Sequence, residues 1–307
     1  MPRSPLPLRH GLNAAWARTP DRDREHPAPW TTVREWLHHK YPEHVDVEAM
    51  LADRRFVYDD GSPVGESDPY RANTFIWFHR DLREEVPVPG SIDVLHRDDR
   101  LVVVDKPPFL STIPRGQHVL QSVVVRLRDE LGLPELSPVH RLDRVTSGVL
   151  MLSTERRWRG PYQSMFEHGT VTKTYRAQAP FRADLELPVT VRNHLQKDRG
   201  AWQAYVVEGA PVNAETLVEL ESRESDLAVY KLSPRTGRTH QLRLHLHGLG
   251  IPIVNDPLYP DVVETSVDDF SRPLQLLASE IGFTDPVDGA ERRFASARRL
   301  PLTADRA

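Results

Sequence analysis

The second half of the chain contains several strand-like segments in succession. The segment TKTYRAQAP alternates with the period of two that is typical of a half-buried strand, and AYVVEG, AETLVELES and LAVYKLSP follow it. PLQLLASEIGFTDP and ERRFASA add two late strands. Because strands that come in runs, rather than in strict alternation with helices, favour a mixed or antiparallel sheet, we predict an α+β fold with a mixed, mostly antiparallel sheet and flanking helices.

Three segments have the features of helices that would flank this sheet. LQSVVVRLRDELGL has an apolar helical face and stops at Gly132. WRGPYQSMFEHG predicts a helix that ends at its final glycine. TGRTHQLRLHLHGLG has leucines at helical spacing and also closes on glycine, so most of it is predicted to be helical.

The chain divides into three regions. Residues 1–29 are rich in proline and arginine and predict a flexible N-terminal tail. Residues 30–88 contain the helical segment TTVREWLHHKYP, with Thr31 or Thr32 as its possible cap, and two strand-like segments. These predict a small N-terminal α+β module whose role stays open. REEVPVPG is typical of a linker, and residues 91–300 form the predicted main domain. A chain of 307 residues is long enough for such a domain with an appendage.

Composition excludes several classes of protein. The chain has no cysteine, which excludes disulfides, thiolate metal sites and a cysteine nucleophile, and which makes the cytoplasm the expected location. No apolar run approaches the roughly 20 residues that cross a bilayer, and the N-terminus lacks the apolar core of a signal peptide, so we expect no membrane association. The motifs of phosphate-binding loops, dinucleotide folds and zinc proteases are missing.

Charge is distributed unevenly along the chain. The net charge of −4 by itself argues against binding to nucleic acid. Residues 141–182, however, contain eight Lys or Arg and three acidic residues, and residues 231–247 contain four Lys or Arg and no acid. Residues 43–68 show the opposite balance, with eight acidic and two basic residues. Since only the local field meets a phosphate backbone, we expect a basic surface on the main domain.

The stretch SPVHRLDRVTSGVLML contains the first candidate for chemistry. It places Asp143 between Arg141 and Arg144, just before the apolar run at residues 149–152. A tight connection before a buried strand would hold the carboxylate rigidly, and a neighbouring guanidinium would keep it ionised. Such a carboxylate can act as a nucleophile or a general base. A purely structural ion pair near a turn is the alternative.

The stretch SPRTGRTHQLRLHLHGLG contains the second candidate. Arg238 is predicted at the start of a helix on which His240, Arg243 and His247 share one face. A basic helix start of this kind could pair with a carboxylate elsewhere and bind phosphate. Two alternatives are a solvated basic face and a metal site built from His240, His245 and His247. Residues 245 and 247 diverge on a helix, which counts against the metal site.

Tyr175 in TKTYRAQAP is the third candidate. On an alternating strand, Tyr175 and Lys173 lie on the same face. An inward tyrosine is usually part of the core, with its hydroxyl hydrogen-bonded. The functional alternative is that the ring stacks on a base while Lys173 lies near phosphate.

In this order, HRLDRVTSGVLML, TKTYRAQAP and SPRTGRTHQLRLHLHGLGIPIVNDPLY resemble the RluA-type RNA pseudouridine synthases. The lead-in LHRDDRLVVVDKPPFLSTIP resembles the same family, so the resemblance covers about residues 91–300. It implies the pseudouridine synthase fold and an isomerase that converts uridine in RNA to pseudouridine. The glycosidic carbon–nitrogen bond breaks, the uracil turns over, and a carbon–carbon bond forms. The resemblance implies neither a cofactor nor a metal.

The resemblance also implies roles for individual residues. Asp143 matches the catalytic aspartate, which attacks the uracil ring or the ribose or promotes a glycal route, and Arg238 is expected to pair with it. Tyr175 matches the tyrosine that packs on the uracil and assists in removing the carbon-5 proton. Arg141 matches a residue that enters the helix as the uridine flips out, and Leu242 an apolar contact behind the ring. Further RNA contacts are expected from the basic residues of the same motifs: Arg144, Lys173, His240 and Arg243.

The expected partner is RNA, with ribosomal RNA favoured and transfer RNA possible, and the chain is expected to be a monomer. The alternative is a catalytically silent RNA-binding protein that keeps the fold. Family members often carry a small RNA-binding module, but the acidity of residues 43–68 does not suit RNA binding. The chain departs from the family pattern, without touching the catalytic positions, at four residues: Asp105, Asn255, Pro260 and Leu277.

Overall fold

The computed structural model describes residues 3–21, 29–82, 84–116 and 118–303. The chain divides into two compact units, Met1–Glu84 and Glu85–Ala307, and this division falls within the linker segment REEVPVPG. Each unit has hydrophobic clusters of its own. No helix in these described ranges is long and apolar enough to cross a membrane.

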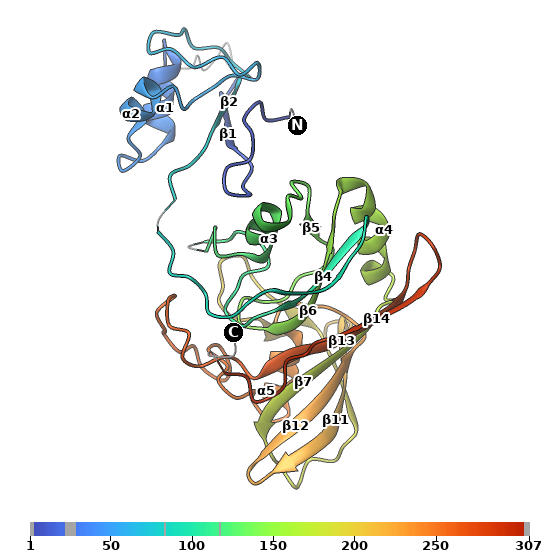
Figure 1. Ribbon diagram of the computed structural model, residues 1–307. Helices are drawn as coiled ribbons and strands as arrows, with labels where there is room; N and C mark the ends of the chain where they lie inside the picture. The colour runs from blue at the N-terminus through green and yellow to red at the C-terminus, as the bar shows by residue number, and fades with distance from the viewer. Residues whose placement is uncertain (1–2, 22–28, 83, 117, 304–307) are drawn as a thin grey trace. The chain divides into compact units, whose positions relative to one another are not determined.

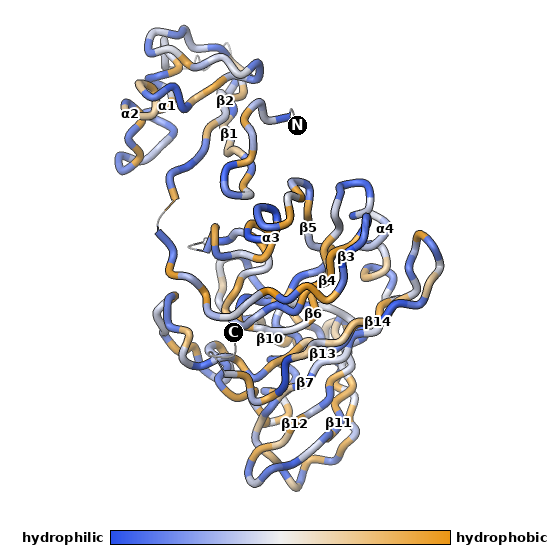
Figure 2. The backbone as a smooth tube through the Cα atoms, viewed as in Figure 1, coloured by the Kyte–Doolittle hydropathy of each residue, from blue (hydrophilic) through white to orange (hydrophobic). Residues whose placement is uncertain are grey.

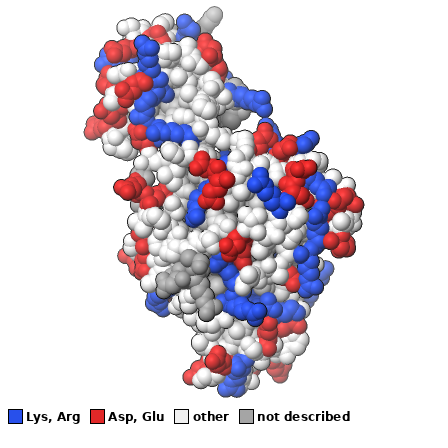
Figure 3. Space-filling model, in the orientation of Figure 1, with Lys and Arg blue, Asp and Glu red and all other residues white. Residues whose placement is uncertain are grey.

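The N-terminal unit combines two short helices with a two-stranded antiparallel sheet (Figure 1). Its elements are β1 (Ala15–Arg18), α1 (Val33–Lys40), α2 (Val47–Ala52) and β2 (Phe75–Phe78). Helix α1 begins at the predicted cap, because the Thr32 side chain accepts a hydrogen bond from the Glu35 backbone and the Glu35 carboxylate reaches back to Thr32. Acidic and basic side chains are interspersed on the face of this unit that Figure 3 shows.

The prediction that residues 1–29 form a flexible tail is wrong for β1. This strand pairs with β2 along its whole length, and Ala17 is buried in the core of the unit. The strand forms because it pairs with β2, which lies some 60 residues downstream. The composition of residues 1–29 gives no indication of such a partner. Residues 22–28 of the predicted tail lie outside the described residues.

The second unit is built on one large mixed sheet (Figure 1). Its strands follow the order β3-β4-β6-β13-β7-β12-β11-β8, with β14 beside β13 and β5 beside β6. Every pairing is antiparallel except that between β6 and β13. This confirms the predicted mixed, mostly antiparallel sheet. The strands are β3 (Asp93–Arg97), β4 (Leu101–Lys106), β5 (Ser137–Pro138), β6 (Ser147–Ser153), β7 (Thr172–Pro180), β8 (Val189–Asn193), β11 (Ala214–Glu224), β12 (Leu227–Pro234), β13 (Leu276–Thr284) and β14 (Glu291–Ala295).

Strands β4 and β6 are buried on both faces, and Figure 2 shows the apolar stretch that they share. One face packs with residues of helix α3 (Val123–Leu131), and the other with residues of helix α4 (Arg156–Glu167). This burial explains why the sequence there is continuously apolar rather than alternating. A third helix, α5 (Gln241–Gly248), belongs to a separate cluster with β7, β11 and β12.

The parallel pairing of β6 with β13 brings distant parts of the chain together. Ala278 of β13 lies opposite Gly148 on one side and opposite Tyr175 on the other. A Cβ at Gly148 would lie 2.2 Å from the Ala278 carbonyl oxygen, and the φ of Gly148 is +108°. Only glycine fits this close approach. The loop that precedes β6 is therefore held near Tyr175.

Candidate active site

A cavity of about 1840 Å³ opens in the second unit, and it brings the three sequence motifs together. Its wall includes the loop before β6, the beginning of β7, the turn after β12 and the first turn of α5. All nine predicted site residues line it: Arg141, Asp143, Arg144, Lys173, Tyr175, Arg238, His240, Leu242 and Arg243.

The loop that carries Asp143 is fixed by side chains from the neighbouring strand connection. The Thr112 hydroxyl donates to the Leu142 carbonyl at 2.7 Å and accepts from the Leu142 backbone N–H at 3.2 Å. On the other side, the buried Lys106 ammonium donates to the Arg144 carbonyl at 3.1 Å and to the Leu110 carbonyl at 2.8 Å. Backbone on both sides of Asp143 is thus hydrogen-bonded, and its carboxylate has a defined position.

Asp143 points into the cavity with its side chain 37% exposed. Its carboxylate oxygen Oδ2 lies 3.6 Å from Nη1 of Arg243 and 3.9 Å from Nε2 of His240. The carboxylate therefore has a cation on its buried side and open space on the other, so it is accessible from the cavity. Such a group can attack an electrophilic carbon or take a proton.

The predicted pairing of Asp143 with Arg238 is wrong. Arg238 is exposed and precedes α5, and its Nε donates to the Asn213 carbonyl at 3.2 Å. Among the described residues, the arginine that forms an ion pair with Asp143 is Arg243. The reason lies in where the helix begins, since α5 starts at Gln241 and its first turn aims Arg243 inward.

Arg243 is not the RNA-surface residue that the sequence predicted, because only 2% of its side chain is exposed. It forms a bidentate ion pair with the buried Asp256, in which Nε lies 2.8 Å from Oδ2 and Nη2 lies 2.5 Å from Oδ1. Burial opposes its charge, but the bonds to Asp256 and the charge of Asp143 outweigh burial and raise the pKa of Arg243. Its third nitrogen faces Asp143, so Arg243 connects a structural carboxylate to a reactive one.

His240 occupies the other side of Asp143. Its Nδ1 lies 3.1 Å from the hydroxyl of Tyr259, and its backbone adopts a left-handed conformation with φ of 58°. Burial lowers the pKa of His240 to about 4, although the negative charge of Asp143 opposes this shift. His240 is therefore neutral near pH 7 and contributes no positive charge for RNA, contrary to the predicted role.

Tyr175 lies at the base of the cavity, half-buried between two hydrophobic clusters. Burial and the charge of Asp143 both raise the pKa of its phenol. No described residue forms a hydrogen bond with its hydroxyl, so the ring and the hydroxyl are available to a ligand. Leu242 belongs to the hydrophobic cluster against which Tyr175 packs and also lines the cavity.

Two further basic residues are bonded to the protein itself. Lys173 donates to the Thr236 carbonyl at 3.0 Å, and burial lowers its pKa. The Arg144 guanidinium donates to the Phe109 and Val267 carbonyls at 3.4 Å each. Both side chains support the walls of the cavity. For Arg144, these bonds indicate a structural role rather than the expected contact with RNA. Arg141 differs, because it is exposed and forms no ion pair or side-chain hydrogen bond within the described ranges.

The structure argues against a histidine metal site. Both ring nitrogens of His245 have protein partners, at 2.9 Å from the Thr216 hydroxyl and 3.0 Å from the Asn193 side-chain oxygen. His240 is engaged elsewhere, with Tyr259. The three histidines therefore do not converge on a common point, as a zinc ion would require.

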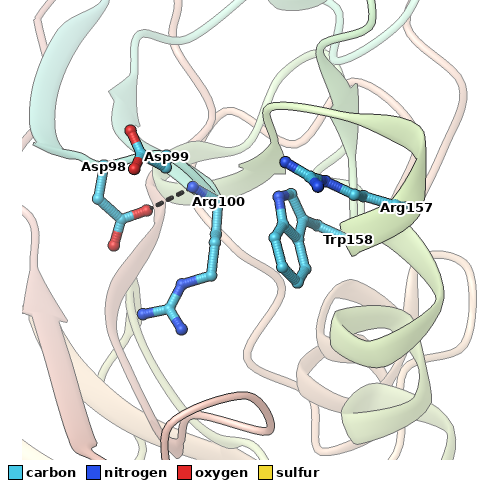
Figure 4. A pocket seen from close by; sticks show the side chains of 5 residues that line it. All are labelled: Asp98, Asp99, Arg100, Arg157 and Trp158. Atoms are coloured by element: carbon cyan, nitrogen blue, oxygen red, sulfur yellow. Dashed lines mark hydrogen bonds between the residues drawn. The ribbon is translucent and has the colours of Figure 1, made fainter.

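A second hollow lies where the turn between β3 and β4 meets the beginning of α4 (Figure 4). Its walls are formed by Asp98, Asp99, Arg100, Arg157 and Trp158. The Arg100 backbone N–H donates to Asp98, its guanidinium pairs with Asp288, and Arg157 lies over the Trp158 ring at 4.8 Å. These contacts are structural, so the chemistry belongs to the larger cavity.

The sequence did not predict the residues whose hydrogen bonds hold the site residues in place. Asp256 and Tyr259 lie in the segment NDPLY, where they fix Arg243 and His240, and Thr112 and Lys106 fix the Asp143 loop. A usable signal was present in the helix, because Arg243 lies among leucines in QLRLHL. A cation on an apolar helical face must pair with a buried carboxylate.

Comparison with known proteins agrees with this geometry. The family model described as RNA pseudouridylate synthase matches residues 100–248. An uncharacterized RNA pseudouridine synthase of Synechocystis is 31% identical over 206 residues, which are 65% of this chain and 69% of the relative. The dual-specificity RNA pseudouridine synthase RluA of Vibrio parahaemolyticus is 32% identical over 216 residues, which are 67% of this chain and 82% of the relative.

A solved structure supports the fold. The human RNA pseudouridylate synthase domain containing 1 matches with a TM-score of 0.55 and 24% identity, over 70% of this chain and 86% of that chain. The fold, the order of the motifs and the sequence relatives lead to one assignment. The chain belongs to the RluA-type RNA pseudouridine synthase family, whose members are isomerases.

Proposed function

We propose that this chain isomerises specific uridines in RNA to pseudouridine in the cavity around Asp143. The observation that carries the proposal is the pairing of a partly exposed carboxylate with the buried Arg243, beside a tyrosine whose hydroxyl forms no hydrogen bond with any described residue. Ribosomal RNA is the favoured substrate and transfer RNA is possible, and the Vibrio relative is named a dual-specificity enzyme. We place the protein in the cytoplasm as a monomer that acts on RNA.

In the proposed reaction, the target uridine leaves the helix and enters the cavity, which costs a few kcal/mol of unstacking. Arg141, which is exposed and forms no ion pair with a described residue, fills the vacated place. Asp143 attacks the uracil ring or the anomeric carbon, or promotes a glycal route, and the bond from N1 to the ribose breaks. After the ring turns, carbon 5 bonds to the ribose, and a bond that Asp143 has formed breaks and returns its electron pair to the carboxylate. Carbon 5 then loses its proton while N1 gains one. Atoms and electrons balance without a redox partner.

The other residues have distinct roles in this proposal. Arg243 pairs with Asp143, a role that the sequence had given to Arg238, and Arg238 contacts RNA from the rim. The Tyr175 ring packs on the uracil, and its hydroxyl is placed to assist the transfer of the carbon-5 proton. Leu242 supplies an apolar surface behind the ring. Lys173 and Arg144 shape the wall.

The test is the purified Asp143→Asn variant, assayed on RNA from cells that lack the gene. It should fold, bind RNA with wild-type affinity and form no pseudouridine, because an amide is not a nucleophile of this kind. Glu167→Gln is the matched control, since it neutralises another carboxylate on the cavity wall and should leave the rate unchanged. Full activity of Asp143→Asn would disprove the mechanism, and inactivity of the wild-type protein would favour a silent RNA-binding protein.

A further inference from the structure

We propose that Trp202 stacks on the base of a nucleotide adjoining the target uridine when RNA enters the cavity. This inference rests on the proposed function and adds a second base-binding position to it. Trp202 lies between the short strands β9 (Leu195–Gln196) and β10 (Tyr205–Val206), outside every motif of the sequence analysis. It lines the same cavity as Asp143.

The exposure of Trp202 is the first observation. The residue is 74% exposed, whereas the other strongly exposed tryptophan in the described ranges, Trp16, is 42% exposed and packs on Phe75 with ring centroids 5.4 Å apart. A large aromatic ring that stays in water while it lines a cavity offers a flat apolar surface to a ligand.

The second observation is that the backbone beside Trp202 is fixed. Gln203 donates through its side chain to the Leu258 carbonyl and, at 3.3 Å, to the Pro260 carbonyl. The Ala204 backbone N–H donates to the Tyr259 hydroxyl at 2.7 Å, and that hydroxyl donates to the Ala204 carbonyl at 3.1 Å. Because Tyr259 also contacts His240, the support of Trp202 is connected to the surroundings of Asp143.

The third observation identifies the chemistry of the ligand. The wall of the same cavity also carries Arg235 and Arg238, which are both exposed. An aromatic ring combined with cations matches a single-stranded nucleotide, whose base stacks and whose phosphate is anionic. Tyr175 is the partner of the target uracil in the proposed reaction, so Trp202 at the wall serves a neighbouring base.

The test is a fluorescence titration with an RNA hairpin whose loop is all uridine. Binding should quench tryptophan emission in the wild-type chain and in Trp16→Phe, and the quenching should be lost in Trp202→Phe. Trp202→Ala should raise Kd by about five- to 150-fold, the fold-change that corresponds to the loss of one stacked base. Trp202→Tyr should restore most of the affinity, because a smaller ring still stacks.

The same titration in the Asp143→Asn background separates this inference from the proposed function, since stacking does not require catalysis. Quenching that depends on Trp202 in that background supports stacking even if the chain forms no pseudouridine. The inference is overturned if Trp202→Ala binds the hairpin as tightly as wild type, or if the quenching survives in Trp202→Phe. In either case pseudouridine formation by the wild-type chain would still support the proposed function.

Discussion

Asp143 forms its ion pair with a residue one hundred positions downstream. Arg243 approaches it to 3.6 Å, and two of the three guanidinium nitrogens of Arg243 are already bonded to Asp256. The buried carboxylate of Asp256 holds the arginine in place, and the arginine in turn lies beside Asp143. Removing the guanidinium would leave both carboxylates without their cation.

The two arginines of TGRTHQLR can be separated by matched substitutions. Arg243→Gln should lower kcat for pseudouridine formation by about 100-fold or more, because the ionised carboxylate loses its partner in a partly buried site. Arg238→Gln removes an exposed side chain with one backbone hydrogen bond and should change kcat less than tenfold. Single-turnover assays on the same RNA measure both, and the opposite order of effects would restore the pairing expected from sequence.

The sequence could identify the catalytic carboxylate but not its partner. Asp143 was predicted because its motif is specific, whereas Arg238 and Arg243 lie five residues apart in one basic segment. Their separation depends on the left-handed backbone of His240, after which the helix begins. A non-glycine residue in that conformation is held by its surroundings, here by Tyr259, so local sequence does not predict it.

At the scale of elements, the parallel pair of β6 and β13 places the loop of Asp143 beside Tyr175. The pairing depends on Gly148, where a side chain would overlap the backbone of Ala278. Asn255, one of the four expected departures from the family pattern, has a φ of +61°. Asparagine is among the non-glycine residues that tolerate this region best, so the departure preserves the turn.

Gly148→Ala should lower the free energy of unfolding by about 2 kcal/mol or more, since it adds a clash to an unfavourable φ. Gly132→Ala is the matched control, because Gly132 has a φ of +65° and nothing lies within 4 Å of an added Cβ. This variant should lose only the stability that the unfavourable φ costs, about 1 kcal/mol. Urea unfolding measures both variants. Equal losses of stability would show that the contact with Ala278 is not limiting.

Elements with strong local patterns were predicted well. The runs of strands gave the sheet, and Thr32 and Gly132 mark helix ends where the sequence placed them. Tertiary context overrode the local pattern elsewhere. AYVVEG contributes only the two residues of β10, and β1 forms in a segment with the composition of a tail. In both cases the partner strand decides the outcome, and its position is not encoded locally.

At the scale of the whole molecule, burial keeps three histidines of the catalytic unit, His140, His240 and His245, neutral near pH 7. Burial lowers the pKa of His140 to about 3, and those of His240 and His245 to about 4. Each pKa lies below its value of about 6.5 in the unfolded chain. The unfolded chain therefore binds more protons below pH 6.5, and the fold should lose stability as the pH falls from about 6.5 toward 4.

This loss should reach about 1.4 kcal/mol per pH unit for each histidine within that window. His245→Asn should reduce the slope of unfolding free energy against pH by about 1.4 kcal/mol per pH unit, which is the contribution of one proton. This expectation holds whatever the effect of the substitution on stability at pH 7. Urea midpoints between pH 4.5 and pH 7 measure the slope. An unchanged slope in His245→Asn would contradict the burial argument.

The most direct test of the central claim is to map pseudouridine in cellular RNA from a strain that lacks the gene and carries either the wild-type chain or Asp143→Asn. The deletion should remove pseudouridine at specific uridines, the wild-type chain should restore it, and Asp143→Asn should not. A deletion that removes no pseudouridine, or a variant that restores every site, would contradict the claim that Asp143 is the catalytic carboxylate of an RNA pseudouridine synthase.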